Sequence, residues 1–447
     1  MADEARDEAI PLAITVTVEA EVEGGSSSEP DLLTDLLSSE ELMLDTVDLR
    51  PSTFTSSAIR DVMLPLMTTN LSVRVLYLPM DRIDLVCAKT IMIMMKNNVG
   101  PPIEELHLSN LPAEDHSSES EPSRKISSMI ISSLKQNKRI KKLFFEPQVV
   151  LHQSVPSSIA AMLYDNTTMK SIILRGCDIS HAGATKISCA LANNASITLL
   201  DLSNNPLSNN GICSVALALE LNTTIQKLKL SGTNIGREGG EAMVEALRVN
   251  KSLHVLDMSR NSLDDHVITK LARSLKQNKS LRQMSLRFNT FSNIGAIRLS
   301  FALYDSTNLR KVLECNHTLQ YLDIGSNKLS KDCIKHANKA LRLNARSSTE
   351  NGVIRKKVSS FLLESESNCF CFRDRFKEKA TLQHLLPNVL WCMNNSTTVL
   401  YYLVKNLAVH SVIATSCPGV IPSIITASSS DSMFSTDNKS NEYLRKI

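Results

Sequence analysis

The stretch Leu253-His-Val-Leu-Asp-Met-Ser-Arg-Asn261 has the form L-x-x-L-x-L-x-x-N. The same frame opens at Met169, Ile197, Ile225 and Leu281, so five copies follow one another at steps of 28 residues. The apolar residues at its first, fourth and sixth positions fall on one side of a short strand and its turn. Equal steps with matching residues indicate a stacked repeat, in which each unit buries its apolar face against the next.

Each copy continues into a helix. A small polar residue or glycine stands where the helix should begin, a position that favours helix capping. These residues are Ser180, Ser208, Gly236, Asp264, Ser292 and Ser330. Apolar residues then recur at helical spacing, as at Ile268, Leu271 and Leu275. Each unit is therefore expected to run strand, turn, helix, turn.

The array extends beyond the five regular copies. Leu319 opens another unit, displaced by an insertion of ten residues, and weaker units open at Leu44, Val73, Ile103 and Ile140. We expect up to ten units in a solenoid over residues 44–343, with the regular units at 169–330. Only the units after residue 169 are regular enough for stacking to be predicted from sequence.

Two polar positions recur with the repeat. The ninth residue of the frame is Cys177, Asn205, Thr233, Asn261, Asn289 or Asn327. A small polar side chain there can pair buried main-chain groups between coils. Asn-x-Ser/Thr also occurs at one phase, at Asn166, Asn194, Asn222, Asn250, Asn278 and Asn316. These could be glycosylation sites, but the shared phase favours asparagines that end helices in the left-handed conformation.

The units from Met169 to Asn327 resemble those of ribonuclease inhibitor, the Ran GTPase-activating protein and the sensor ends of NOD-like receptors. The stretches 301–318 and 353–390 are similar to uncharacterised repeat proteins of unicellular algae. This resemblance to the ribonuclease-inhibitor-like superfamily implies an α/β fold, a curved leucine-rich-repeat solenoid. Such a horseshoe has a parallel inner β-sheet, outer helices and here a C-terminal helical cap. It names no function, because fold does not imply function.

The two ends of the 447-residue chain differ from its middle. The first 50 residues hold fourteen acids and two bases, whereas the whole chain has a net charge of +3. We expect residues 1–43 to be an acidic disordered tail that either solubilises the protein, folds back on the basic solenoid or competes with an acidic partner. Residues 344–410 are expected to form the helical cap, because the last coil exposes an apolar face, and 411–447 a flexible tail.

Several features indicate a cytoplasmic or nuclear protein. The acidic N-terminus lacks the basic region of a signal peptide, and the ten cysteines show no paired spacing typical of secreted domains. The longest uncharged apolar run, residues 408–427, is interrupted by Pro418 and Pro422. A membrane partner is therefore not expected.

Catalytic and metal-binding motifs are missing from the sequence. It has no phosphate-binding loop, no H-E-x-x-H and no G-x-S-x-G. Cys369-Phe-Cys371, with His384 and Cys392, fits structural zinc spacing poorly, so free thiols are favoured. Asp264-Asp265-His266 could be catalytic but lies at the helix-capping phase. We expect no enzyme activity, no cofactor and no metal.

A basic cluster could contact nucleic acid or another anionic surface. It comprises Lys135, Lys138, Arg139, Lys141 and Lys142. These residues span a helix end and the next strand start, where such repeats are normally charged, and only Phe144 and Phe145 follow as aromatics. The sequence therefore argues against nucleic-acid binding.

The open face of the predicted sheet is the candidate binding surface, because residues between the inward leucines face away from the core. The candidate partner-binding residues are Arg175, Asp201, Lys227, Lys229, Asp257, Arg287, Tyr321 and Asp323. Their alternating charges suit a protein-binding strip, and they also suit simple solvation or pairing between neighbouring strands.

We therefore expect a monomeric, non-enzymatic scaffold or sensor that binds a protein partner on the concave face. The alternative is a GTPase activator resembling the Ran activator, which would present an Asn or Arg from the turns beyond the strands. Asn205, Asn261 and Asn289 would serve only if they left their structural role. A sensor arm of an immune receptor is disfavoured because no nucleotide-binding domain accompanies the repeats.

Overall fold

A computed structural model describes residues 14–16, 44–51, 54–68, 72–109, 121–145, 154–307, 309–345, 352–354, 356–358 and 360. The chain forms two compact units. Unit 1 holds Met1–Ser274, Ser280–Gly295 and Leu322–Leu329, and unit 2 holds Leu275–Lys279, Ala296–Tyr321 and Ser330–Ile447. The predicted cap beyond residue 360, the Cys369 group, the apolar run at 408–427 and the C-terminal tail lie outside the described residues.

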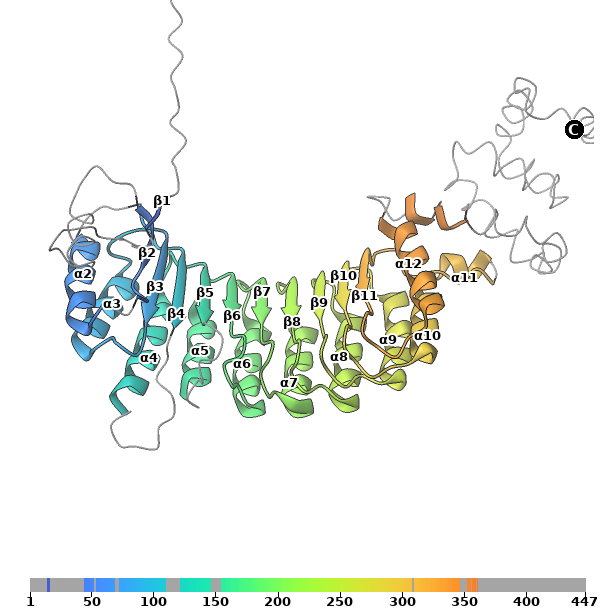
Figure 1. The fold of residues 1–447 in the computed structure, drawn as a ribbon, viewed down its shortest axis with the longest axis horizontal. Helices are drawn as coiled ribbons and strands as arrows, with labels where there is room; N and C mark the ends of the chain where they lie inside the picture. Colours follow the sequence, from blue (N-terminus) through green and yellow to red (C-terminus); the bar gives the residue numbers. More distant parts are fainter. Residues whose placement is uncertain are drawn as a thin grey trace, which may run out of the picture. The chain divides into compact units, whose positions relative to one another are not determined.

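Eleven strands of the described residues form one sheet, in which the strand order follows the chain order (Figure 1). The strands are β1 (Ile14–Val16), β2 (Leu44–Asp48), β3 (Val75–Pro79), β4 (Glu105–Ser109), β5 (Lys142–Phe145), β6 (Ser171–Ile173), β7 (Leu199–Asp201), β8 (Lys227–Lys229), β9 (Val255–Asp257), β10 (Gln283–Ser285) and β11 (Tyr321–Asp323). The pairs from β1 to β10 are parallel. The predicted parallel sheet is confirmed.

Helices alternate with the strands, and in unit 1 they lie along one side of the sheet (Figure 1). They are α2 (Ser56–Thr68), α3 (Leu85–Asn97), α4 (Glu121–Ser133), the 3-10 turn η2 (Leu134–Gln136), α5 (Ser154–Asp165), α6 (His181–Asn193), α7 (Ser208–Leu221), α8 (Arg237–Val249), α9 (Asp265–Gln277), α10 (Asn293–Leu303), α11 (Leu309–Leu313) and α12 (Lys331–Ala345). Among the described helices, none has the length and apolarity to cross a membrane. The fold is an α/β leucine-rich-repeat solenoid.

The weak units before residue 169 stack as regularly as the later ones. Their first core residues, Val73, Ile103 and Ile140, are buried. Strands β3, β4 and β5 pair in continuous register, with Leu76 opposite Leu106 and Leu106 opposite Leu143. Burial of one face fixes the register here, because a one-residue slip would expose every core side chain.

The segment assigned to a disordered tail contains one strand. β1 at Ile14–Val16 pairs with β2, with Val16 opposite Val47 and a shift in register after Ile14. The sequence Ile-Thr-Val consists of β-branched residues, which fit a pleated strand. The edge of β2 supplies the hydrogen-bonding partners. The rest of residues 1–43 lies outside the described part of the chain.

The asparagines at the glycosylation-like phase join each coil to the preceding one. The Asn194 side-chain amide donates to the carbonyl oxygens of Leu163 and Asn166, at 2.8 and 3.3 Å. Its Oδ1 accepts the backbone N–H groups of Ser196 and Ile197, at 2.9 and 2.8 Å. One buried side chain thus pairs main-chain groups on both sides of a coil junction.

The same bridge recurs along the array. Donation to the preceding coil and acceptance from the following turn are found at Asn137, Asn166, Asn194, Asn222, Asn250 and Asn316. The predicted left-handed conformation is wrong: Asn194 has φ −72° and ψ 125°, and Asn222 has φ −75° and ψ 132°. The extended backbone turns the side chain inward, which is why the amide reaches the preceding coil.

A second ladder occupies the ninth position of the frame, as predicted. Asn205 Oδ1 accepts the N–H groups of Cys177 and Ile179, both at 2.9 Å, and its amide donates to the oxygen of Leu174 at 2.7 Å. Asn261 repeats the arrangement two coils later, accepting from Thr233 and Ile235. In these units buried asparagines therefore hold both ends of the strands.

Helix capping follows the prediction at some units and not at others. Ser180 caps α6 by accepting the N–H of Gly183 at 3.5 Å, and Asp264 accepts the N–H of Val267 at 3.0 Å before α9. Ser208 does not cap α7, which it begins with φ +57°. The helix following Gly236 is capped from the preceding coil, where Asn209 Oδ1 accepts the N–H of Gly236 at 2.8 Å.

Unit 2 contains the insertion and a buried lysine. The short helix α11 lies between α10 and β11, where the sequence has its ten extra residues. Lys357 is fully buried, and its Nζ donates to the oxygens of Leu303 and Asn316 at 2.5 and 2.6 Å. It also lies 3.2 Å from His317 Nδ1. Because His317 Nε2 faces the Leu313 oxygen at 3.1 Å, Nδ1 is the ring's acceptor, and three acceptors surround the amine.

The asparagine bridge leads to a stability prediction at Asn194. Asn194→Ala leaves two carbonyl oxygens and two N–H groups without their side-chain partner, so we expect a loss of roughly 2–4 kcal/mol in the free energy of unfolding. Asn193→Ala is the matched control, because Asn193 is the exposed last residue of α6. Its effect should stay within about 0.5 kcal/mol. Urea unfolding followed by circular dichroism measures both, and equal effects would contradict the bridging role.

Lys357 predicts a pH dependence of stability. Burial lowers the pKa of Lys357 from 10.5 to about 7, while the nearby Cys315 thiol opposes the shift. The folded pKa lies below the unfolded one, so between these two values the unfolded chain binds more protons. This lysine therefore adds stability as the pH rises from 7 toward 10.5, and the addition disappears as the pH falls back to 7. Thermal unfolding should show this rise in the wild type and a smaller one in Lys357→Met.

Candidate functional site

The open face of the sheet in unit 1 carries one continuous row of side chains. The row consists of Asp48, Tyr77, His107, Phe144, Ile173, Asp201, Lys229, Asp257 and Ser285, each opposite the next on the neighbouring strand. We call this set the sheet row. Its neighbours along each strand are buried core residues such as Leu228 and Leu256, so the row points away from the helices.

Aromatic rings stack along the first part of the sheet row. The Tyr77 and His107 ring centroids are 4.1 Å apart, and those of His107 and Phe144 are 4.2 Å apart with an interplanar angle of 2°. The guanidinium of Arg50 lies 4.1 Å from the Tyr77 centroid and is held by Asp48 Oδ2 at 2.6 Å. All three rings are partly exposed. They form a continuous aromatic stack at one end of a row whose other end is mainly charged.

The sequence prediction did not include these rings. They occupy the fifth position of the frames that open at Val73, Ile103 and Ile140, which is the position of Asp201 in the regular units. Extending the same rule to the weak units would have found them. The predicted binding residues come only from the units that open at Met169 and later.

Three predicted binding residues lie in the second part of the sheet row. Lys229 Nζ is 3.4 Å from Asp201 Oδ2, so neighbouring strands do pair opposite charges. Asp201 is only 5% exposed, and its Oδ1 accepts the N–H of Ser203 at 3.0 Å. Asp257 Oδ1 likewise accepts the N–H of Ser259 at 2.9 Å. Asp201 therefore stabilises the strand end, and Lys229 and Asp257 remain accessible.

The other predicted residues flank the row. Lys227 begins β8, and Arg175 and Arg287 follow β6 and β10; all three are exposed and make no ion pair with the described residues. Asp323 ends β11, and its Oδ1 accepts the N–H of Gly325 at 2.9 Å. Tyr321 is exposed but belongs to unit 2, so it is not grouped with this surface.

The turn asparagines proposed for the GTPase-activator alternative are not exposed. Asn205, Asn261 and Asn289 are buried, and all three donate their amides to carbonyl oxygens between coils. Releasing any of them would leave main-chain groups unpaired. The Asp264-Asp265-His266 cluster also has structural contacts: Asp265 accepts the N–H of Gly295 at 2.8 Å, and His266 lies 3.0 Å from Glu241.

The basic cluster before β5 is largely engaged within the protein. Lys135 pairs with Asp165 at 2.5 Å, and Lys141 and Lys142 pair with Glu104 and Glu105 at 2.7 and 2.5 Å. Arg139 donates to the oxygens of Gly100 and Pro101. The cluster therefore presents much less unpaired positive charge than its sequence suggests.

The described cysteines and acids form no metal site. Within the described ranges, no group of three His, Cys, Asp or Glu side chains could hold a metal ion. Cys87, Cys177, Cys189, Cys213, Cys315 and Cys333 are free thiols. Burial raises the pKa of Cys87 and of Cys177 to about 12, so neither is a thiolate at neutral pH.

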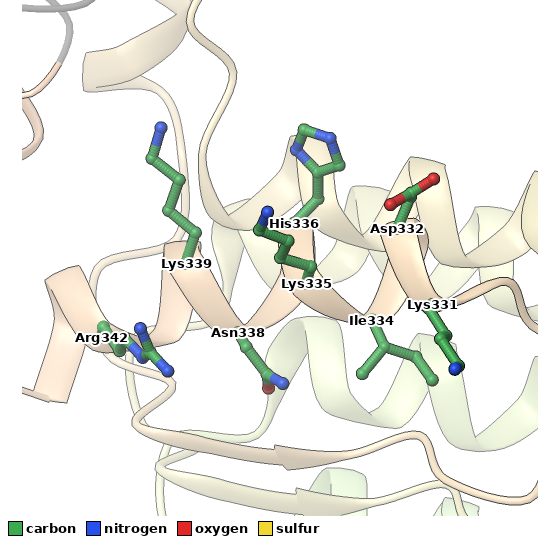
Figure 2. A pocket seen from close by; sticks show the side chains of 8 residues that line it. All are labelled: Lys331, Asp332, Ile334, Lys335, His336, Asn338, Lys339 and Arg342. Atoms are coloured by element: carbon green, nitrogen blue, oxygen red, sulfur yellow. The ribbon is translucent and has the colours of Figure 1, made fainter.

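A pocket of about 650 Å³ lies against α12 in unit 2. Figure 2 shows that the eight labelled side chains all project from this one helix. They include the cations Lys331, Lys335, Lys339 and Arg342, with Asp332 as the single acid. A basic helix face of this kind is ordinarily a solvated surface.

Comparison with known proteins agrees with the fold. The family model described as Leucine Rich repeat matches residues 165–188, 221–244 and 315–332. The first two matches contain β6 with the first part of α6 and β8 with the first part of α8, and the third contains β11. No curated protein sequence matches the chain.

Two solved structures are similar to part of the chain. The structure titled Leiomodin-1 Actin-Binding Site 2 shares 16% identity and covers 48% of this chain and 98% of its own, with a TM-score of 0.30. The tropomodulin C-terminal domain from Caenorhabditis elegans shares 18% identity and covers 42% of this chain and 92% of its own, with a TM-score of 0.29.

Proposed function

We propose that this protein is a non-enzymatic interaction scaffold or sensor that binds a partner protein on the sheet row of unit 1. Leucine-rich-repeat domains generally mediate protein–protein interaction, and the repeats here are of that class. The proposal adds the surface: the open face of the sheet, which the unit 1 helices leave uncovered (Figure 1).

One observation carries the proposal, namely the aromatic stack that continues into charged residues along the same row. Interfaces are enriched in aromatic side chains and arginine, which give much area at low cost in side-chain entropy. Tyr77, His107 and Phe144 supply that area, and Arg50 lies against its end. Lys229 and Asp257 on the following strands supply charges that orient a partner.

The repeat subtype, the cellular compartment, the oligomeric state and the roles of the flanking segments are also part of the proposal. The 28-residue units with full helices, such as α6 and α8, support a ribonuclease-inhibitor-like subtype. The likeness to algal repeat proteins rests on the sequence of residues 301–318 and 353–390. Free thiols at the described cysteines fit a cytoplasmic or nuclear protein. The proposed protein acts as a monomer. Apart from β1, residues 1–43 would form an acidic tail, residues 344–410 a helical cap and residues 411–447 a flexible tail.

We favour the scaffold over the GTPase activator because the turn asparagines are occupied. An activator would need an asparagine or arginine free to approach a bound nucleotide. Asn205, Asn261 and Asn289 are committed to main-chain partners instead. Nucleic acid is disfavoured because the basic cluster before β5 is mostly paired.

Affinity capture with a sheet-row variant tests the surface. The wild type and the variant Tyr77→Ala/Phe144→Ala/Lys229→Ala are each used to capture proteins from a lysate of the source cells. The mass-spectrometric intensity of the wild-type partners should be at least roughly tenfold lower with the variant. The control is Tyr164→Ala/Leu217→Ala/Arg273→Ala, which changes exposed residues on helices α5, α7 and α9.

The control should retain the wild-type partners, and both variants should unfold as cooperatively as the wild type. Partners that survive the sheet-row variant, or that are lost equally from the control, would contradict binding at the sheet row. GTP hydrolysis by a panel of small GTPases, measured with and without this protein, distinguishes the scaffold from the GTPase activator. Stimulation above the intrinsic rate would contradict the non-enzymatic assignment.

A further inference from the structure

An exposed aromatic ring with two arginines lies just beyond the ends of β9 and β10. The Phe288 side chain is 40% exposed. The guanidinium carbons of Arg260 and Arg287 lie 4.6 and 4.9 Å from its ring centroid. We call Arg260, Arg287 and Phe288 the Arg–Phe cluster; all three belong to unit 1.

Backbone geometry gives no reason for these residue types. The eighth position of each regular unit has a positive φ, and earlier units place Gly176, Asn204 and Gly232 there. Arg260 and Phe288 occupy the same position with φ of 53° and 54°. For a residue with a bulky side chain this conformation is less favourable than it is for glycine. Folding alone would favour glycine or asparagine at both positions.

Contacts within unit 1 give little in return. Stacking of a guanidinium on an aromatic ring is a weak interaction where both groups are exposed to solvent. Arg260 and Arg287 are exposed and form no ion pair with the described residues. Two like charges are thus held against one ring. Strained and exposed residues of this composition are typical of binding sites.

We infer that the Arg–Phe cluster binds an acidic peptide segment of the partner protein. A guanidinium stacked on a ring keeps its N–H edge available, and that edge matches a carboxylate with two parallel hydrogen bonds. A carboxylate placed between Arg260 and Arg287 would relieve their mutual repulsion. An apolar residue next to it in the segment would cover the Phe288 ring.

A peptide suits this surface better than a nucleic acid. Asp257 and Asp323 end the strands on either side of β10, and the Asp323 oxygen accepts the N–H of Leu286 at 2.7 Å. A phosphate backbone carries a charge at every few ångströms and would be repelled by both acids. A single carboxylate with apolar neighbours places its charge only at the arginines.

The acidic segment of the same chain is a poor occupant. β1 and β9 are eight strands apart in the sheet, which is roughly 38 Å at about 4.8 Å per strand. The thirteen residues before Ile14 span at most about 45 Å when fully extended. Residues 17–43, which hold more of the acids, are tied to β1 and β2 at their two ends, so they reach at most about 50 Å from the sheet edge. In both cases reaching the cluster would require a largely extended chain and would cost much chain entropy. We therefore assign the acidic peptide that binds the Arg–Phe cluster to a separate partner protein.

Fluorescence anisotropy with the full-length protein and a fluorescein-labelled peptide, in which one glutamate is flanked by leucines, tests the inference. The wild type should bind the peptide, and added salt should weaken binding. Arg260→Ala/Arg287→Ala should raise the Kd at least roughly tenfold. The matched control is Arg273→Ala/Arg282→Ala, which removes two exposed arginines that lack ion pairs with described residues, and its Kd should change by less than about twofold.

Phe288→Asn separates binding from folding. Asparagine already occupies this position at Asn204, so thermal stability should be kept or raised while the peptide Kd rises at least about threefold. No binding by the wild type, equal losses in the two double-arginine variants, or an unchanged Kd in Arg260→Ala/Arg287→Ala would overturn the inference. Tighter, arginine-dependent binding of labelled oligouridylate would reassign the cluster to nucleic acid and also overturn it.

This inference rests on the proposed function, because it gives the chemistry of the protein partner. The sheet-row variant Tyr77→Ala/Phe144→Ala/Lys229→Ala should keep the wild-type peptide Kd. If partners survive the sheet-row variant while peptide binding still requires Arg260 and Arg287, only the sheet-row proposal fails. If capture depends on the sheet row but the peptide does not bind, only the acidic-segment inference fails.

Discussion

The rest of the structure depends on the buried asparagine at the end of each helix. A solenoid coil brings main-chain groups into the interior at every turn, and a coil by itself cannot pair them all. Asn194 and its equivalents solve this by joining three consecutive coils in one chain of hydrogen bonds: Asn194 donates to the Asn166 oxygen, and Asn222 donates to the Asn194 oxygen. An asparagine therefore recurs at the same point of every coil from the one that opens at Ile140 to the one that opens at Leu319, and this shared point keeps the five frames from Met169 to Leu281 at one spacing.

Functional positions follow from that constraint. The ladder and the leucine core occupy most phases of the unit, and the phases left open are those facing away from the helices. At these phases the side chains differ from coil to coil, from Tyr77 and His107 to Lys229. The shared register turns them into one row, so a binding surface is assembled from residues distant in sequence. Some charged residues of the row are structural: Asp201 is buried and accepts a backbone N–H at the end of its strand. Only the exposed charges of the row can contact a partner.

Departures from the local rules are the other sign of function. Phe288 occupies a left-handed position where glycine or asparagine would cost less, and no contact within unit 1 explains it. Lys357 also departs from the rule that cations stay exposed, but its three acceptors give a structural account. The difference is whether the protein itself satisfies the unusual side chain. A residue that both its sequence position and its contacts explain belongs to the repeat framework. An unusual residue that no internal contact explains, such as Phe288, points to a partner.

The sequence by itself determined the repeat, the parallel sheet, both asparagine positions and the strip of alternating residues, because a 28-residue period fixes which side chains share a face. It also indicated that Asn166 to Asn316 are structural, although it assigned them a left-handed backbone. Only the tertiary structure decided what their side chains do, since the partner of Asn194 lies in a different coil. The aromatic stack, the burial of Asp201 and Lys357, and the meeting of Arg260 with Phe288 depend on distances between coils. A period in the sequence sets the order of such contacts but not their geometry.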